Sequence, residues 1–555
     1  MPSNSDMTYL KFLLILFVFF AGQLHAQDFL PLNREFLLPY DRALAPKKIE
    51  FHTSIKPYNS AELDTLINTD SLYDFRQLNI SRKRLVGRIA DNLLNRHLIN
   101  VDTAGFVLHV DPLLNVDLGR ETVSGKKVYT NTRGIQAFGS IGKKVSFYTS
   151  FYENQATFSP YIDTFITEYK VVPGQGESKP FKPEELTRAY DYNMAYGWVT
   201  YTPSRYFNFQ FGQGKNFIGD GYRSLLLSDN SFAYPFLKVT TSVWKIKYVN
   251  LFTQFQDIRG SQMVVNGKGT GYPKKFGTFH YLSINIGRSL TVGLFESIIW
   301  PGGDSTFKRG YDVAYLNPII FYRSVEFSQG SSDNALMGLN LKYKLNSKWY
   351  LYGQFILDDF KLNEFKNKNY RYQQKYGYQL GTRIFDPFNI NNLALQGEYN
   401  VVMPYTYSHR TIEQNYSHYN QALAHPLGAN FKELVGIVDY RYKRFFTQLK
   451  YIYAQYGVDT GNVSYGRNIF IPDYGGMYNG VNYTYPYAKH PAQGPRNNLH
   501  YLEFKTGYLI NPKTNMRLTL SYVNRTITGY GASNNKTHYY SVGFSTNLQN
   551  FYYDF

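Results

Sequence analysis

Five tyrosines gather in one loop-like segment near the C-terminus of the chain. Residues 469–497 read IFIPDYGGMYNGVNYTYPYAKHPAQGPRN, where glycine, asparagine and proline favour turns. A tyrosine ring offers a flat apolar face and a hydroxyl, so several rings beside amides form a surface on which sugars can stack and hydrogen-bond. The alternative is that the rings pack into a plug over the interior. The predicted carbohydrate contacts are Tyr474, Tyr478, Tyr483, Tyr485 and Tyr487.

Signatures of catalysis are missing from the sequence. There is no G-x-S-x-G, no H-E-x-x-H, no phosphate-binding loop with its Lys-Ser/Thr ending, and no cysteine. The glycine-rich stretch 211–221, FGQGKNFIGDG, lacks the strand–loop–helix context of a nucleotide site. We therefore expect a protein that is not an enzyme, with no catalytic residues, no metal site and no cofactor.

A second loop, residues 219–234, contains an apolar run whose contact with water would be unfavourable. An exposed patch of this kind implies burial, so we expect the loop to fold inward and narrow a pore. The predicted pore-occluding residues are Tyr222, Arg223, Leu225, Leu226 and Leu227.

The elements that position these loops have the period of β-strands. In 206–211 three phenylalanines alternate with Asn208 and Gln210, and similar alternation recurs along the chain. The chain is 18% aromatic with a mean hydropathy of −0.38, which suits strands with one face toward lipid and one toward water. A soluble all-β protein is the competing interpretation. The strands are predicted at 107–121, 130–139, 144–155, 191–203, 206–218, 235–244, 248–258, 276–287, 290–300, 335–345, 348–360, 375–386, 393–405, 431–441, 444–457, 498–510, 515–527 and 538–551.

Connection lengths favour a membrane barrel over a soluble sandwich. Tight connections such as SIGKK, TPSR, IGRS and NPKT alternate with long ones such as 156–190, 301–334 and 458–497. Short periplasmic turns that alternate with long extracellular loops are typical of bacterial outer-membrane barrels. We predict an all-β transmembrane protein, a closed antiparallel outer-membrane barrel of about 18 strands spanning 106–555.

The C-terminus fits this location. Phe551, Tyr553 and Phe555 alternate, as in the terminal strand by which outer-membrane barrels are recognised for insertion, and we predict that they form this signal. Phe555 then lies at the periplasmic end of the last strand. The triplet has the opposite parity to Tyr540, Val542 and Phe544, so either a β-bulge lies near 547–550 or the strand starts later.

The N-terminus reads as an export signal followed by a short periplasmic segment. Lys11 precedes the apolar run FLLILFVFFA, which is too short to span a membrane, and Ala26 suits a cleavage site. We predict a signal peptide at 1–26 and a periplasmic segment at 27–105. In this segment Ser81 can cap a helix whose apolar face holds Val86, Ile89, Ala90 and Leu93. This helix is either a cap packed against the barrel mouth or a docking surface for a periplasmic partner.

The net charge and the predicted outer-membrane location limit the kinds of partner that the protein can have. The formal net charge is +18, so a basic barrel can hold lipopolysaccharide phosphates or acidic polysaccharide; alternatively, the basic side chains pair with acids across the bore. We expect contacts with outer-membrane lipid and lipopolysaccharide, and no nucleic acid.

Four stretches resemble the Wzi-like capsule-assembly family of outer-membrane barrels: FGQGKNFIGDGYRSLLLSDNSFAYPFLKVTT (211–241), AYLNPIIFYRSVEF (314–327), LYGQFILDDF (351–360) and YSHYNQALAHPLGANFKE (416–433). The sequence is most similar to the Bacteroidota subgroup of gliding-motility RemB proteins, which FHTSIKPYN (51–59) also fits. The resemblance implies an 18-stranded barrel with an N-terminal helical element. It implies a lectin-like role in holding capsular polysaccharide, or a gliding role linked to type IX secretion and adhesin components.

These observations predict a non-enzymatic outer-membrane barrel that acts at the cell surface, in polysaccharide attachment or in gliding motility. Two alternatives stay open. One is a porin or transporter for a small solute, and the other is a structural subunit of a larger outer-membrane secretion complex.

Overall fold

The computed structural model describes residues 29–47, 50–73, 78–182, 188–259, 264–265, 268–269, 271–303, 309–321, 333–359, 374–475, 477–478, 480–532, 535–546 and 549–555. The predicted signal peptide lies outside these residues. Among the described residues, no helix is long and apolar enough to cross a bilayer.

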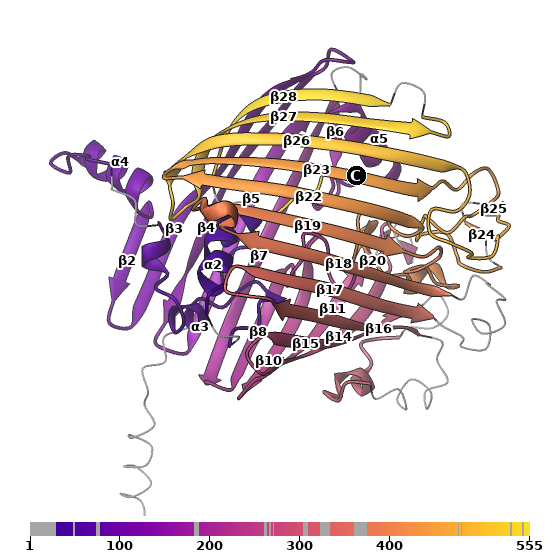
Figure 1. Cartoon of the computed structure of the whole chain (residues 1–555), viewed down its shortest axis with the longest axis horizontal. Helices are drawn as coiled ribbons and strands as arrows, with labels where there is room; N and C mark the ends of the chain where they lie inside the picture. Colours follow the sequence, from indigo (N-terminus) through magenta and orange to yellow (C-terminus); the bar gives the residue numbers. More distant parts are fainter. Residues whose placement is uncertain are drawn as a thin grey trace, which may run out of the picture.

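The chain forms a closed antiparallel barrel of 18 strands (Figure 1). Each strand pairs with the next along the sequence, and the last pairs with the first. The prediction of an outer-membrane type of barrel is confirmed. Its strands are β3 (Phe106–Glu121), β4 (Lys127–Ile141), β5 (Val145–Thr157), β7 (Ala189–Ser204), β8 (Phe207–Gly214), β10 (Tyr234–Val243), β11 (Ile246–Gln256), β14 (Lys274–Ile286), β15 (Leu290–Pro301), β16 (Asn334–Lys344), β17 (Trp349–Asp359), β18 (Lys375–Phe385), β19 (Leu393–Val402), β22 (Phe431–Tyr442), β23 (Phe445–Gly457), β26 (Arg496–Asn511), β27 (Met516–Gly529) and β28 (Lys536–Ser545).

Alternation along the strands turns one face outward and the other into the bore. In β8, Phe207, Phe209 and Phe211 are exposed, whereas Asn208 and Gln210 are buried. The burial of β7 alternates in the same way, with Met194, Tyr196 and Trp198 inside. Because side chains on a strand alternate between faces, the apolar outer band faces lipid and the polar face lines the interior.

The two ends of the barrel differ. At one end, called here the short-turn end, strands are joined by turns such as 142–144 and 287–289; at the other, the long-loop end, they are joined by long connections. Exposed aromatic side chains ring the short-turn end, where such girdles mark a membrane–water interface. They are Tyr206, Trp244, Phe388, Tyr442 and Phe445.

The seam of the barrel departs from the sequence prediction. β28 ends at Ser545, which pairs with Asn115 of β3. The remaining edge of β3 pairs instead with β2 (Ile99–Thr103), from Ile99 opposite Val110 to Thr103 opposite Phe106. Because β2 occupies the place where β28 would continue, the predicted strand end at 551 is wrong.

Shorter elements surround this frame. Before the barrel come α2 (Arg34–Leu44), β1 (Ile55–Lys56), α3 (Ser60–Asp64), η1 (Asp70–Tyr73) and α4 (Leu85–Asn95). In the connections lie α5 (Pro160–Tyr169), η2 (Val313–Leu316), η3 (Pro387–Asn389), η4 (Ile412–Gln414) and the short strands β6 (Lys179–Lys182), β9 (Phe217–Ile218), β12 (Val264–Val265), β13 (Lys268–Gly269), β20 (Ser417–His418), β21 (Gln421–Ala422), β24 (Met477–Tyr478) and β25 (Val481–Asn482).

The predicted helix at 82–98 exists as α4, but two details differ. Its N-cap is Arg84, which makes no capping hydrogen bond, so the predicted cap at Ser81 is wrong. Asp91 and Asn95 are its buried residues, whereas Val86 and Ile89 are exposed. The helix therefore packs through its polar side. Its role, either a cap packed against the barrel mouth or a docking surface for a periplasmic partner, stays a prediction.

Candidate functional site: a filled bore beneath a loop surface

The N-terminal segment closes the short-turn end. The carboxylate of Glu35 in α2 pairs with Lys505 of β26 at 2.9 Å and with Arg517 of β27. Asp41, two turns further along α2, pairs with Arg383 of β18 at 2.8 Å. Burial raises the pKa of Glu35, but the charges of Arg517 and Lys505 lower it well below its ordinary value.

The same segment also reaches the opposite wall. His52 Nδ1 lies 2.7 Å from the hydroxyl of Ser283 on β14, and Glu62 pairs with Lys247 of β11. Contacts with strands on both sides of the barrel place residues 29–47 and 50–67 across the bore. The segment also has its own apolar core, made of Phe36, Leu37, Tyr40, Leu44, Phe51, Tyr58, Leu63 and Ile67.

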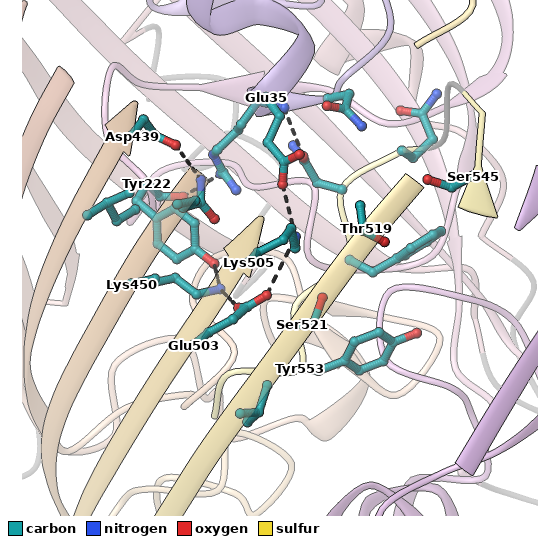
Figure 2. Close-up of a pocket in the computed structure, with 18 of the residues that line it drawn as sticks. Glu35, Tyr222, Asp439, Lys450, Glu503, Lys505, Thr519, Ser521, Ser545 and Tyr553 are labelled. Carbon is teal, nitrogen blue, oxygen red and sulfur yellow. Dashed lines mark hydrogen bonds and ion pairs between the residues drawn. The ribbon is translucent and has the colours of Figure 1, made fainter. Parts of the chain in front are cut away.

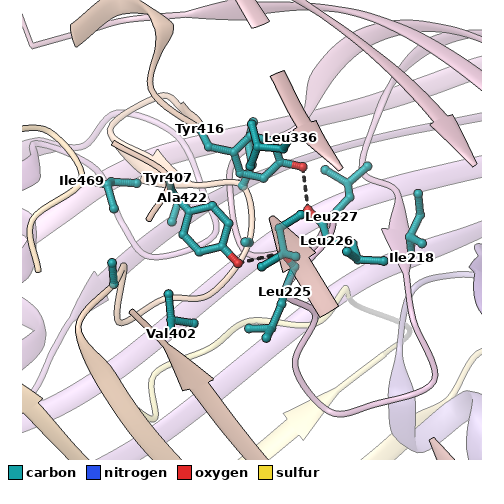
Figure 3. Packing of buried hydrophobic residues seen from close by; sticks show 14 of the residues in the cluster. Ile218, Leu225, Leu226, Leu227, Leu336, Val402, Tyr407, Tyr416, Ala422 and Ile469 are labelled. Atoms are coloured by element: carbon teal, nitrogen blue, oxygen red, sulfur yellow. Dashed lines mark hydrogen bonds between the residues drawn. The ribbon is translucent and has the colours of Figure 1, made fainter. Parts of the chain in front are cut away.

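The connection between β8 and β10 turns into the bore and pairs with the N-terminal segment. Its β9 pairs with β1, with Ile218 opposite Ile55. Leu225, Leu226 and Leu227 are fully buried (Figure 3). The loop therefore lies inside the barrel, as its apolar composition predicts; that it occludes a pore stays a prediction.

Two tyrosines from another connection hold this leucine run. The hydroxyl of Tyr407 donates to the carbonyl oxygen of Leu225 at 2.7 Å, and that of Tyr416 donates to the carbonyl oxygen of Leu226 at 2.5 Å (Figure 3). Both tyrosines are fully buried and their rings stack 5.6 Å apart. Backbone groups that the inward fold removes from water are thus satisfied by side chains.

Arg223 lies inside the bore and is only 1% exposed. Its guanidinium pairs with Glu433 of β22 at 3.1 Å and with Asp554 at 3.0 Å. His425 Nε2 lies 2.8 Å from the other oxygen of Glu433, and the backbone N–H of Arg223 donates to Glu398 of β19 at 3.1 Å. Buried charges need partners of this kind, so Arg223 joins the loop to the wall and to the C-terminus.

The last seven residues run through the bore and form no strand. The N–H of Asn550 donates to the carbonyl oxygen of Leu32 at 2.9 Å, and the hydroxyl of Tyr552 donates to Asp229 at 2.7 Å. Phe551, Tyr553 and Phe555 therefore do not extend β28, and their predicted place at its periplasmic end is wrong. Their role as an insertion signal stays a prediction.

The chain terminus meets the loops of the other end. The ring of Phe555 lies 5.0 Å from Phe165 and 6.3 Å from Tyr161, both on α5, and its carbonyl oxygen accepts from Arg525 at 2.9 Å. Residues 549–555, called here the C-terminal tail, thus connect the N-terminal segment to α5. Burial raises the pKa of Asp554, but the charges of Arg223 and Lys450 lower it well below its ordinary value.

A cavity of about 370 Å³ remains between the N-terminal segment, the C-terminal tail and the wall (Figure 2). Hydroxyl groups and one carboxylate line one side, contributed by Asp117, Thr519, Ser521, Ser541 and Ser545. The opposite side holds the ion pairs of Glu35, Lys450, Glu503 and Lys505. A cavity of this size with hydroxyl and charged groups in its lining can hold ordered waters.

Loops cover the long-loop end. α5 packs through Ile162 and Ile166 against Tyr190 and Tyr192 of β7. The hydroxyl oxygen of Tyr405 lies 2.8 and 2.7 Å from the carbonyl oxygens of Ser464 and Pro486, which share its one hydrogen, and this ties the connection 403–430 to the connection 458–495. The surface above the bore is therefore built from several loops bonded together.

The five predicted carbohydrate tyrosines all lie on this surface. Tyr474 is 48% and Tyr487 52% exposed, whereas Tyr478, Tyr483 and Tyr485 are half-buried. The Tyr485 ring lies 6.4 Å from Tyr405, and Arg410 lies over the Tyr474 ring at 5.8 Å. Each of the two predicted roles, open stacking faces and packing inside a plug, matches some of the five.

Comparison with solved structures places the fold among outer-membrane barrels. The fold is similar to that of Wzi. The match to this Escherichia coli outer-membrane protein, described as a carbohydrate-binding β-barrel involved in group 1 capsule assembly, has a TM-score of 0.55 at 13% identity and covers 94% of this chain and 100% of Wzi. Pseudomonas aeruginosa OprD matches with a TM-score of 0.40 at 10% identity over 81% of this chain and 99% of OprD. Neither the protein-family models nor the curated proteins give a match.

The sequence did not single out the acids that hold Arg223. Glu433 and His425 stand in YSHYNQALAHPLGANFKE, and Asp554 stands between two aromatic residues of the presumed terminal strand. The one signal in the sequence was Arg223 itself, because it stands beside a leucine run that is expected to be buried. A buried arginine requires a buried acid as its partner.

Proposed function

We propose that this protein is a non-enzymatic outer-membrane barrel that holds surface polysaccharide on its long-loop end. The observation that carries the proposal is the filled bore, since the N-terminal segment, the inward loop and the C-terminal tail occupy it together. A barrel whose bore is occupied by these described segments acts through its surface. The short-turn end then faces the periplasm and the long loops face outward.

The binding surface is assigned to the tyrosine-bearing loop. Tyr474 and Tyr487 are each about half exposed, with Arg410 over the Tyr474 ring. The connection that carries both is tied to the connection 403–430 through Tyr405. Wzi, which shares the fold, is itself described as carbohydrate-binding. Between the two cellular roles, capsule attachment is supported by this likeness; gliding motility, with type IX components as partners, rests on the sequence resemblance alone.

Retention on immobilised surface polysaccharide from the source bacterium tests the proposal. The double variant Tyr474→Ala and Tyr487→Ala is expected to lose retention, whereas Tyr530→Ala, an exposed tyrosine of another connection, is the matched control. Equal retention of both variants and the wild type would show that Tyr474 and Tyr487 do not form the binding site. Scoring a deletion strain for capsule retention and for colony spreading separates the two cellular roles.

One observation favours a solute channel as the second candidate. The 370 Å³ cavity is already a chamber inside the barrel, lined partly by polar and charged side chains, and it would become part of a path if the segments around it moved. Planar-bilayer recordings distinguish the candidates: the filled bore predicts no ion-conductance steps for the full chain, and regular steps would support the channel.

A further inference from the structure

The helix α4 buries its polar side and exposes its apolar side. Its buried side chains are Asp91 and Asn95, while Leu85, Val86 and Ile89 are 65%, 77% and 49% exposed. The polar side has its partners within the protein: Asp91 pairs with Arg82 at 2.5 Å, and Asn95 bonds both backbone groups of Leu78. The inversion is therefore held in place by specific contacts.

The position of α4 is also fixed. The side-chain amide of Asn511, at the end of β26, donates to the carbonyl oxygens of Leu93 and Arg96 at 2.9 and 2.8 Å. This anchors the helix at the short-turn end of the seam, beside β2 (Figure 1). Its exposed apolar face therefore belongs to a helix that is bonded to the end of a barrel strand.

The lipid-facing surface of the barrel continues from β3 onto β2. Ile99 lies opposite Val110, and Val101 opposite Leu108. Directly opposed residues of an antiparallel pair share a face, and these β3 residues share the parity of Val116 and Leu118, which are exposed on the outer wall. Ile99 and Val101 are exposed as well, so an apolar path leads from the wall to Ile99, which follows shortly after the C-terminal end of α4 at Asn95.

Basic residues border the apolar face. The sequence from 82 to 88 is RKRLVGR, and Lys83, Arg84 and Arg88 are exposed. An apolar face with arginine and lysine at its border is typical of helices that lie in a membrane interface, where the cations meet anionic headgroups. A water-facing helix of a soluble domain would show the opposite arrangement.

From this geometry we propose that α4 docks on the phospholipid leaflet at the short-turn end. Leu85, Val86 and Ile89 enter the boundary between headgroups and acyl chains, and Lys83, Arg84 and Arg88 bind anionic headgroup phosphates. The helix then fastens the seam, where β28 is short and β2 replaces it, to the membrane beside it.

The absence of cysteine from the chain makes site-specific labelling straightforward. Val86→Cys carries an environment-sensitive fluorophore in the full chain, reconstituted into vesicles of phosphatidylethanolamine and phosphatidylglycerol containing a spin-labelled lipid quencher. Leu237→Cys on the outer wall is the positive control, and Thr65→Cys, exposed at the same end of the barrel, is the negative control. We expect quenching at Val86 close to that at Leu237.

Quenching at Val86 no greater than at Thr65 would overturn the proposal and leave a protein partner as the occupant of this face. A second variant tests the charges: Lys83→Gln, Arg84→Gln and Arg88→Gln together should reduce quenching at Val86 about twofold or more in anionic vesicles. An unchanged signal there would refute headgroup binding. These substitutions lie on an exposed surface, and a heat-modifiable band on a gel verifies that each variant is folded.

Discussion

Replacing Asp554 by Asn tests whether the C-terminal tail is part of the folded bore. The carboxylate of Asp554 lies between Arg223, at 3.0 Å, and Lys450, at 2.9 Å, and also accepts from the hydroxyl of Tyr222. Asparagine keeps the shape but removes the negative charge. Arg223 and Lys450 then lose part of the negative charge that balances them, in a buried site where Asp554 is only 1% exposed.

The expected cost follows from the burial of this pair. Removing one partner of a buried ion pair destabilises by about 3–5 kcal/mol. Glu433 and Glu503 still neutralise part of the charge, which puts the expected loss at the lower end, about 3 kcal/mol. The exposed Glu168→Gln on α5 is the control, for which a change within about 0.5 kcal/mol is expected.

Urea-induced unfolding of the barrel in detergent micelles measures the difference. Trp198 is a suitable reporter, because it is buried on the inner wall and stacks on Tyr148 with ring centres 4.5 Å apart. A loss no larger than that of Glu168→Gln would refute the placement of the tail. A double-mutant cycle with Lys450→Met isolates the pair, with an expected coupling of about 0.5–3 kcal/mol.

Further predictions concern pH, packing and assembly. Because the pKa of Asp554 is lowered, the stability gap between wild type and Asp554→Asn should be constant above the ordinary carboxyl pKa of about 3.9 and shrink as the pH falls below it; a gap that grows on acidification contradicts the ion pairs. Leu226→Ala should cost about 2–5 kcal/mol in the same urea assay, with the exposed Leu237→Ala as control. Deletion of residues 549–555 should still allow refolding in detergent, seen as a heat-modifiable band, because β28 closes the barrel without them. Failure of that variant to assemble in cells, despite refolding in detergent, would support the predicted insertion signal, and normal assembly would exclude it.

The barrel could be predicted from the sequence because each strand carries its own signal. Phe207, Phe209 and Phe211 indicate an outer face whatever lies next to them, and the alternation of short and long connections orders the strands. The leucine run 225–227 likewise indicated burial by itself. These are local properties, readable within one segment.

The contents of the bore could not be predicted in the same way. Glu35, Asp41 and Asp554 look like ordinary surface acids, since their partners lie hundreds of residues away on other strands. The parity break before Phe551 did indicate that the last strand was wrongly drawn. The reason, β2 occupying the edge of β3, depends on a pairing that no local pattern encodes.

A continuous series of ion pairs links the three segments that fill the bore. The series runs in the order Glu35, Lys505, Glu503, Lys450, Asp554, Arg223 and Glu433. The N-terminal segment contributes Glu35 at one end of the series, and the inward loop contributes Arg223 near the other end. Moving any single segment out would remove one ionic partner from at least one buried charge, which is costly. Any opening of this barrel must therefore move the N-terminal segment, the loop and the C-terminal tail together, so that a conducting state, where one exists, is reached in one cooperative step.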